Sequence, residues 1–314
     1  MPSGLTFAKH GRTRLKIKMK KIAPLLITVA AALWGTMGLF VRTLTDLGYT
    51  TFQLVFCRAA LTAMTLIAYF LFFDREKLKI KLKDLWMFLL PSLVSVILFN
   101  FCYMNAINSG SISIAATLLY TAPIFVTVIS ALMFKEKITP LKTVMLAMAF
   151  TGCVLVSGVI GSDAAISAKA LGFGIASGFT YGMYSIFTKI GLRKYSPLTF
   201  TAYTFLISAI IAAFICKPAE LVNITAQKPS NIVILILFAL ATNVIPYICF
   251  TSGLKYMDAG KANITATIEP VVATLFGIFV FNERLTVISA LGIFLVLFSA
   301  VILNAPHKNH TPKY

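Results

Sequence analysis

The sequence predicts an all-α integral membrane protein with ten transmembrane helices, arranged as two inverted five-helix repeats around a central cavity. Three observations lead to this fold class. The 314 residues are 59% hydrophobic and 12% charged, with a mean hydropathy of +0.89, which is more apolar surface than one soluble core can bury. Ten apolar stretches follow one another with short connections. A group of residues near the middle of the chain returns near its end at a spacing of 147 positions.

The apolar stretches come first, because they define the elements. Each has about the 17–25 residues that a helix needs to cross the hydrocarbon core. In chain order, the ten predicted spans are Ile22–Thr43, Thr51–Phe73, Leu85–Ala106, Ile112–Phe134, Thr139–Val159, Leu171–Ile190, Leu198–Ile215, Ile232–Leu254, Ala262–Phe281 and Val287–Leu303.

The repeat is carried by six closely spaced positions. Scattered matches are expected by chance in so apolar a chain, so this dense cluster is the basis for inferring an internal duplication. Its first copy consists of Pro123, Thr127, Phe134, Glu136, Lys137 and Thr139, and its second of Pro270, Thr274, Phe281, Glu283, Arg284 and Thr286. Gly35 and Gly182 keep the same spacing.

The cationic residues predict the orientation. Lys and Arg concentrate in cytoplasmic loops of membrane proteins. With the N-terminus inside, 22 of the 28 Lys and Arg residues fall on the cytoplasmic side and five on the other, and Arg58 lies within a span. This bias favours ten spans with both termini in the cytoplasm, in the cell inner membrane. Each repeat then has five spans, so the second copy enters the bilayer inverted, as in many secondary transporters.

These features divide the chain into four parts. We expect a basic cytoplasmic tail over 1–21, a first repeat over 22–159, an inverted second repeat over 169–303 and a cytoplasmic tail over 304–314. The basic tail resembles the start of a signal peptide, but the stretch after it has the length of a full span, so a retained first helix is expected.

Several classes of function are disfavoured by what the sequence lacks. The net charge of +18 is spread over short clusters between apolar runs, which fits membrane topology better than nucleic-acid binding. The five cysteines form no CxxC pair, and His10, His307 and His310 all lie in the tails, so neither a metal nor a cofactor is expected. A membrane-embedded enzyme is a remote alternative, because a paired aspartate, a serine with histidine and an HExxH motif are all missing. Without a GxxxxGK[ST] loop, energy would come from gradients rather than ATP.

Two prolines predict equivalent bends in the two halves. Pro123 and Pro270 remove an amide donor near the middles of the fourth and ninth spans, which frees carbonyls that only protein or a watery cavity can tolerate. We expect both to act as hinges. Thr139 and Thr286 are expected to cap the helices that follow. Gly174, Gly178 and Gly182 share one helix face and predict a close packing seam.

The proline-bent helices, each followed by a short acidic turn and a capped helix, resemble those of the EamA-type members of the drug/metabolite transporter superfamily. In the first copy the resemblance runs from Ala122, Pro123, Ile124 and Phe125 to Lys135, Glu136 and Lys137. In the second it runs from Ile268, Glu269, Pro270, Val271 and Val272 to Asn282, Glu283 and Arg284. It implies a ten-helix fold whose cavity is lined mainly by helices one, three, four, six, eight and nine, with helix two at the periphery. It also implies transport, usually export, of small metabolites.

Glu269 is the most informative single position. An ionised carboxylate in the middle of a span costs about 2.5 kcal/mol or more on insertion scales, so such residues usually face an interior and have a function. Its repeat partner is Ala122, so the shared fold does not require the acid. We hypothesise substrate binding and proton coupling at Glu269; the alternative is a permanently hydrogen-bonded carboxyl that closes the gap left by Pro270.

Aromatic and polar side chains complete the predicted substrate site. Trp34 and Tyr181 occupy equivalent positions in the first and sixth spans and are candidates to stack on a substrate or on each other. Arg58 could hold an anionic group, but a structural tie is favoured because the resemblance puts its helix at the periphery. The residues assigned to substrate binding are Trp34, Asn105, Tyr120, Tyr181, Asn243, Thr265 and Glu269.

The function predicted from the sequence is secondary-active or facilitative transport by alternating access. The expected cargo is a small metabolite such as an amino acid or a related amphipathic compound, with export as the expected direction and proton coupling as a further hypothesis. The partners expected are this substrate and the lipid bilayer, with a homodimer left open. The alternative is a lipid or lipid-headgroup translocase whose cavity opens sideways to the bilayer.

Overall fold

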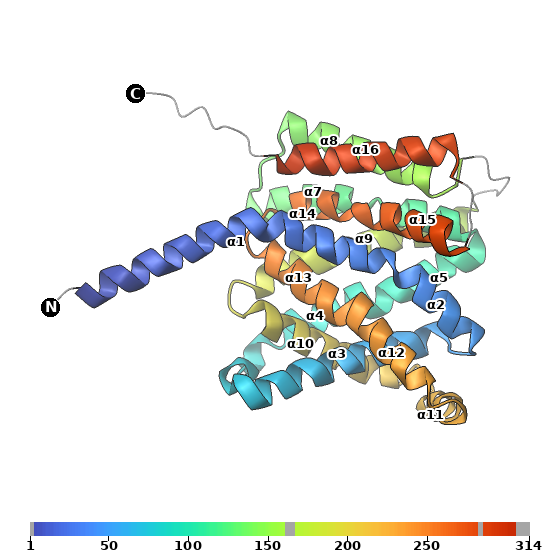
Figure 1. Ribbon diagram of the computed structural model, residues 1–314, viewed down its shortest axis with the longest axis horizontal. Coiled ribbons are helices and arrows are strands. Elements are labelled where there is room, and N and C mark those ends of the chain that lie inside the picture. The colour runs from blue at the N-terminus through green and yellow to red at the C-terminus, as the bar shows by residue number, and fades with distance from the viewer. Residues whose placement is uncertain (1–2, 161–166, 282–284, 306–314) are drawn as a thin grey trace.

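The computed structural model describes residues 3–160, 167–281 and 285–305, and the regular elements in these ranges are all helices (Figure 1). The first half contains α1 (Ser3–Gly35), α2 (Met37–Asp46), α3 (Thr51–Phe73), the 3-10 turns η1 (Arg75–Leu78) and η2 (Leu82–Asp84), α4 (Trp86–Leu90), the π-helix η3 (Pro91–Leu98), α5 (Phe99–Ser109), α6 (Ile112–Leu119), α7 (Ala122–Phe134) and α8 (Pro140–Val156). The second half contains α9 (Ala168–Gly191), α10 (Pro197–Ala213), α11 (Pro218–Gln227), α12 (Asn231–Ala239), the π-helix η4 (Leu240–Val244), α13 (Ile245–Leu254), α14 (Ala259–Ala266), α15 (Ile268–Phe281) and α16 (Val287–Asn304).

The helices confirm a multi-pass membrane protein. In the described part of the chain, seven helices are long and apolar enough to cross a bilayer, or eight if α10 and α11, which meet at 95°, form one bent span. All ten predicted stretches fall on helices. However, α8 has only 17 residues, and the glycines, serines and tyrosines of α9 lower its mean hydropathy. The count of ten therefore stays a prediction.

The fourth and ninth spans are interrupted where Pro123 and Pro270 predict bends. The fourth span breaks between α6 and α7, and Pro123 is the second residue of α7. The ninth breaks between α14 and α15, and Pro270 lies in the first turn of α15. Proline is tolerated in a first turn because its missing amide would have no helical partner there. In both halves, therefore, the helix after the break begins with a proline in its first turn.

A second irregularity also occurs in both halves. The third span contains the π-helix Pro91–Leu98, and the eighth contains the π-helix Leu240–Val244, at overlapping positions of the repeat. A π turn adds a residue per turn and leaves carbonyls free for other donors. The sequence analysis did not predict either one.

The packing of the helices shows that the two halves run in opposite directions. Helix α3 packs along α10, its repeat equivalent, and Tyr203 near the start of α10 donates a hydrogen bond of 2.6 Å to the carbonyl of Leu78, which follows the end of α3. Helices α8 and α16 pair in the same way at one edge of the bundle (Figure 1), with Gly152 late in α8 against Gly292 early in α16. Because each helix lies antiparallel to its own equivalent, the repeats are inverted.

Glycines hold the repeats together at equivalent contacts. A Cβ placed on Gly35 of α1 would lie 2.8 Å from the carbonyl oxygen of Glu269, and one placed on Gly182 of α9 would lie 3.2 Å from that of Ala122. Such distances exclude larger residues. Gly178 likewise lies against Leu118, so the predicted close seam on the sixth span is confirmed.

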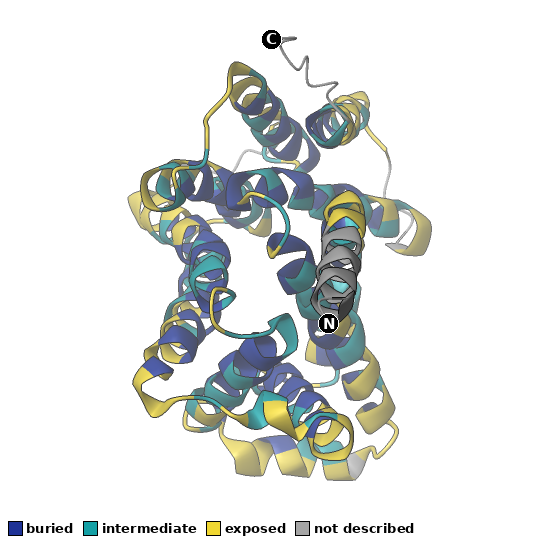
Figure 2. Ribbon diagram, turned by 90° about the vertical axis from the view of Figure 1, so that its left-hand side faces the viewer, coloured by how far each residue is buried: buried dark blue, intermediate teal, exposed yellow. Residues whose placement is uncertain are grey.

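Caps and lipid-facing surfaces complete the scaffold. Thr139 accepts a hydrogen bond from the amide of Lys142 at 3.2 Å, and Thr286 accepts one from the amide of Ser289 at 3.0 Å, so both predicted caps are confirmed. Figure 2 shows buried positions turned toward the interior of the bundle and exposed ones outward. Many exposed side chains are large and apolar, as lipid contact requires; they include Phe72, Leu132, Phe214, Phe279 and Val287. The turn with Glu283 and Arg284, and the histidines His307 and His310, lie outside the described residues.

Candidate functional site

We name the two ends of the bundle by residues that lie there. The Glu136 end contains the chain segments 74–85, 135–139, 192–196 and 255–258, and the Thr51 end contains the segments 47–50 and 110–111. Hydrogen bonds between distant segments agree with this division, since Glu136 contacts the start of α14 and Ser167 donates to the carbonyl of Ser109 at the other end.

A cavity of about 200 Å³ lies between the two halves and reaches toward the Thr51 end; we call it the central cavity. Its walls come from all six of the spans that the resemblance implies, namely the first, third, fourth, sixth, eighth and ninth, and from α3 of the second span as well. The side chains that line it are Trp34, Met37, Val41, Thr51, Leu54, Val55, Arg58, Phe99, Asn100, Tyr103, Met104, Ile107, Leu119, Tyr181, Phe238, Tyr247 and Glu269. The placement of the second span at the periphery is therefore wrong: α3 contributes four of these residues, because its packing between α10 and η4 turns one face inward.

The structure brings three of the seven assigned site residues together. Trp34, Tyr181 and Glu269 all line the central cavity, although they come from α1, α9 and α15. Tyr181 donates a hydrogen bond of 3.3 Å to Oε2 of Glu269. The carboxylate belongs to the first turn of α15, where unpaired amides and the helix dipole favour negative charge.

The other four assigned residues lie elsewhere. Asn105 lines a separate surface hollow at the Thr51 end and donates to the carbonyl of Phe101 at 2.8 Å. Tyr120 packs against a buried apolar cluster that includes Cys153 and Val271. Neither side chain is among those that line the central cavity.

Asn243 and Thr265 tie helices to each other. The amide of Asn243 donates to the hydroxyl of Thr62 at 2.9 Å and to the carbonyl of Arg58 at 3.3 Å, which fixes η4 against α3. The hydroxyl of Thr265 accepts a hydrogen bond of 2.8 Å from Asn304 of α16. The amide nitrogen of Asn243 and the hydroxyl of Thr265 are thus used inside the helix packing.

Arg58 is the second charge on the wall of the central cavity. Its side chain is buried, and its Nη1 lies 3.7 Å from the sulfur of Met37, a weak acceptor. No carboxylate among the described residues lies within ion-pair distance of this guanidinium. Holding a charge at such a depth costs about 2.5–3.5 kcal/mol on insertion scales. The cavity thus combines one cation and one anion that are not paired with each other.

Aromatic rings close the central cavity toward the Glu136 end. The rings of Trp34 and Tyr247 meet edge to face with centroids 5.1 Å apart, and Tyr184 contacts Tyr247 at 5.0 Å. Trp34 is held in place because its indole donates to the carbonyl of Thr242 in η4 at 3.1 Å. Beyond this layer lies a small space of about 10 Å³, which Trp34, Tyr181 and Tyr247 also line. The expected pair of Trp34 and Tyr181 therefore contributes to one partition, with Tyr247 as the ring that Trp34 contacts.

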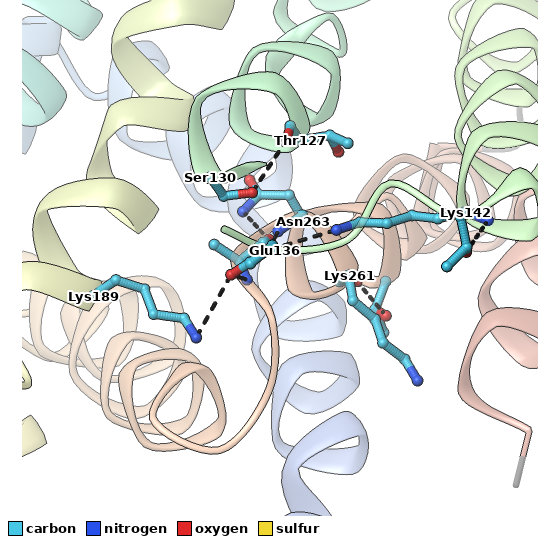
Figure 3. A network of polar contacts seen from close by, with 11 residues as sticks. Thr127, Ser130, Glu136, Lys142, Lys189, Lys261 and Asn263 are labelled. Carbon is cyan, nitrogen blue, oxygen red and sulfur yellow. Dashed lines mark hydrogen bonds and ion pairs between the residues drawn. The ribbon is translucent and has the colours of Figure 1, made fainter. Parts of the chain in front are cut away.

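Polar contacts join the two halves at the Glu136 end (Figure 3). Glu136 follows α7 and accepts hydrogen bonds from the amides of Ala259 at 2.8 Å and Gly260 at 3.3 Å, so it caps α14 of the other half. Lys142 lies 3.5 Å and Lys189 3.8 Å from its carboxylate oxygens. The side chain of Glu136 is only 6% exposed, which strengthens these charged contacts. In Figure 3 Lys261 points away from this group.

A second charged contact joins the halves at the same end. Asp84, which precedes α4, accepts hydrogen bonds from Lys194 at 2.6 Å and from Tyr195 at 2.9 Å in the turn between α9 and α10. Together with the Glu136 contacts it holds the two halves together at this end.

Comparison with known proteins agrees with this architecture. The model of the EamA-like transporter family matches the chain twice, over residues 21–158 and 168–305. The chain belongs to the EamA-like transporter family. Every residue that lines the central cavity falls within one of the two matched segments.

Relatives in this family extend along nearly the whole chain. An uncharacterized transporter of Archaeoglobus fulgidus is 28% identical over 286 residues, which cover 88% of this chain and 94% of the relative. The uncharacterized transporter YwfM of Bacillus subtilis is 23% identical over 92% of this chain and 96% of its own. A crystal structure at 17% identity superposes with a TM-score of 0.74 over 89% of this chain and 95% of its own, which supports the fold.

Sequence reasoning missed part of the cavity. Tyr247 and Tyr103 line it, but their helices are apolar on several faces, so spacing alone does not show which face turns inward. For Tyr247 a signal was available: it is separated from Asn100 by the repeat spacing of 147, so one predicts the other.

Proposed function

We propose that this protein is a secondary transporter that moves a small amphipathic metabolite, such as an amino acid, by alternating access. The observation that carries this proposal is the central cavity, which holds a carboxylate, a guanidinium and several aromatic rings between two inverted repeats. Such a pocket suits a small molecule with both charged and apolar parts. Facilitated efflux without coupling uses the same cavity.

The closed Glu136 end suggests the direction of opening. We assign this end to the cytoplasm, because the Lys and Arg residues of the sequence concentrate in the segments that lie there. The cavity then faces the outside, and export requires a second state in which the Glu136 end is open. Reaching it means releasing Glu136 from α14 and Asp84 from Lys194, with the helix breaks at Pro123 and Pro270 as hinges.

Glu269 is the proposed site of proton coupling. Its carboxylate lines the cavity and is within reach of the Tyr181 hydroxyl, so gain or loss of a proton changes the charge that a substrate meets. A proton entering from outside would neutralise Glu269 and release a cationic group, and loss of the proton toward the cytoplasm would prepare the site for the next substrate.

The test of transport uses purified full-length protein in vesicles loaded with a mixture of amino acids, amines and small carboxylates. Efflux of each compound is measured by mass spectrometry with equal pH on both sides and with the outside more acidic by one unit. We expect selective efflux that the gradient accelerates. Movement of labelled lipids alone would contradict the proposal and favour the lipid translocase.

Glu269→Gln is expected to lose the acceleration by the pH gradient, because an amide cannot carry the proton, and to bind a cationic group more weakly, because the amide is uncharged. Glu220→Gln is the matched control, since Glu220 is an exposed carboxylate of α11 paired with Lys217 at 3.0 Å. Unchanged gradient dependence in Glu269→Gln would remove the coupling role from this residue and leave facilitated transport.

A further inference from the structure

We propose that Arg58 binds a carboxylate of the substrate, so that the transported molecule carries an acidic group at one end and a cationic group at the other. This inference rests on the proposed transport function and adds the chemical class of the cargo. Its starting observation is a guanidinium that lines the central cavity, is only 8% exposed and contacts no carboxylate of the described residues.

A purely structural role does not account for the side chain. The segment of α3 around Arg58 is tied to η4 through the main chain, because the carbonyl of Arg58 accepts hydrogen bonds from Thr62 at 2.7 Å and from Asn243 at 3.3 Å. These contacts would remain with any residue at this position. Among the described residues, the guanidinium makes one hydrogen-bond contact, from Nη1 to the sulfur of Met37 at 3.7 Å.

The shared fold does not require an arginine here either. The anchor residues Thr51 and Phe52 of α3 recur as Thr199 and Phe200 of α10, and the same offset pairs Arg58 with Leu206. Helix α10 thus occupies the equivalent place in the other repeat with an apolar residue. The charge belongs to the cavity of this chain and not to the repeat.

The chemistry of the two charges defines the ligand. A guanidinium offers a planar fork of donors that matches a carboxylate in two parallel hydrogen bonds, and desolvation strengthens them. Glu269 on the opposite repeat supplies the negative partner for an ammonium group. The rings of Trp34 and Tyr247 lie in the same wall and provide apolar and cation-binding faces. A volume of about 200 Å³ is below that of sites for drug-sized ligands, so the zwitterion is small.

The chain provides a reporter inside the cavity. It has two tryptophans, and Trp86 is exposed on α4, so the Trp86→Phe protein reports from Trp34 alone. Amino acids other than tryptophan and tyrosine are titrated into this purified full-length protein. The amino acid with the largest change in Trp34 fluorescence is then compared with its amide, which lacks the negative charge, and with the corresponding acid that lacks the amine.

We expect the amino acid to bind about 10–100-fold more tightly than its amide, the range for losing charge-assisted hydrogen bonds. Arg58→Gln should bring the affinity for the amino acid down to that for the amide, while the amide binds within about two-fold of the unsubstituted protein. The retained amide affinity shows that the cavity is intact. Arg58→Lys, which keeps the charge and loses the fork, should lie between the two. Arg75→Gln is the control, because Arg75 is exposed beyond the end of α3.

The inference is overturned if amino acid and amide bind equally, if Arg58→Gln keeps the preference for the amino acid, or if no carboxylate changes the Trp34 signal. The first comparison needs no substitution at Arg58, so it holds even if Arg58→Gln does not fold. A result that contradicts the role of Arg58 can be told apart from a result that contradicts transport. Vesicles that release the amino acid through the Arg58→Gln protein at the normal rate would support transport and refute the role of Arg58, whereas carboxylate binding without movement would do the reverse.

Discussion

The two repeats share their scaffold but not the charges in their common cavity. Gly35 and Gly182 make the same close contact with a neighbouring helix, and Thr139 and Thr286 cap equivalent helices. The charged positions differ: Glu269 of the second repeat matches Ala122 of the first. In the same way, Arg58 of the first repeat matches Leu206 of the second.

This difference separates the positions that maintain the fold from those that determine binding. A twofold-related cavity built from identical repeats would place like charges on facing walls, where they repel each other at low dielectric. Here each repeat contributes a charge of opposite sign, and neither position is charged in the other copy. Positions common to both copies therefore maintain the fold, and unshared polar positions of the cavity determine what it can bind.

The strongest test of this comparison gives one pair of unshared positions the same residue in both repeats. Ala122→Glu should lower the free energy of unfolding by about 3 kcal/mol or more, because Ala122 is 1% exposed and a carboxylate there would be buried without a partner. Glu269→Ala should abolish transport with stability kept within about 1 kcal/mol, because Glu269 faces the cavity. Thermal unfolding of the purified variants measures both. A stable Ala122→Glu protein would show that the first repeat also has room for a charge at this position.

A smaller effect is expected at the shared glycines. Gly35→Ala and Gly182→Ala should each destabilise the protein by about 1–3 kcal/mol, because the new methyl group would press on a backbone carbonyl and a valine of another helix. Gly38→Ala and Gly172→Ala are matched controls with no atom within 4 Å of the added carbon, and their stability should stay the same or rise slightly. Equal changes in stability at all four sites would contradict the conclusion that close helix packing requires glycine at Gly35 and Gly182.

The smallest expected effect is at the two caps and tests the symmetry itself. Thr139→Ala and Thr286→Ala should each cost about 1 kcal/mol, since each removes one hydrogen bond from the start of an exposed helix end. The two values should agree within about 0.5 kcal/mol, measured as shifts in thermal unfolding, because the environments are alike. A loss at only one cap would indicate that the repeats no longer share this part of the scaffold.

The scaffold was largely predictable because it depends on local signals. Pro123 and Pro270 mark the two helix breaks, and apolar length marks the spans, both without knowledge of neighbouring helices. The spacing of 147 then relates one half to the other. The inverted arrangement follows from the distribution of Lys and Arg, which depends on position along the chain alone.

The lining of the cavity was less predictable, because it depends on how each helix is rotated. Asn243 looks like a cavity residue in sequence, yet its amide is used by the carbonyl of Arg58 and the hydroxyl of Thr62. Arg58 looked peripheral because of its helix, and the packing turned it inward. Glu136 was expected only as part of a turn, and its role as a cap for α14 is a contact across more than 120 positions of the chain.

The π-helix η4 has a consequence for the aromatic partition. Its widened turn at Leu240–Val244 exposes the carbonyl of Thr242 to the indole of Trp34. The same turn also determines how α13, which follows it in the chain, is rotated about its own axis. One residue corresponds to about 100° around a helix axis. Removing a single residue from this turn would swing Tyr247 and Phe250 away from Trp34, and the barrier between the central cavity and the Glu136 end would lose its rings without any change to the rings themselves.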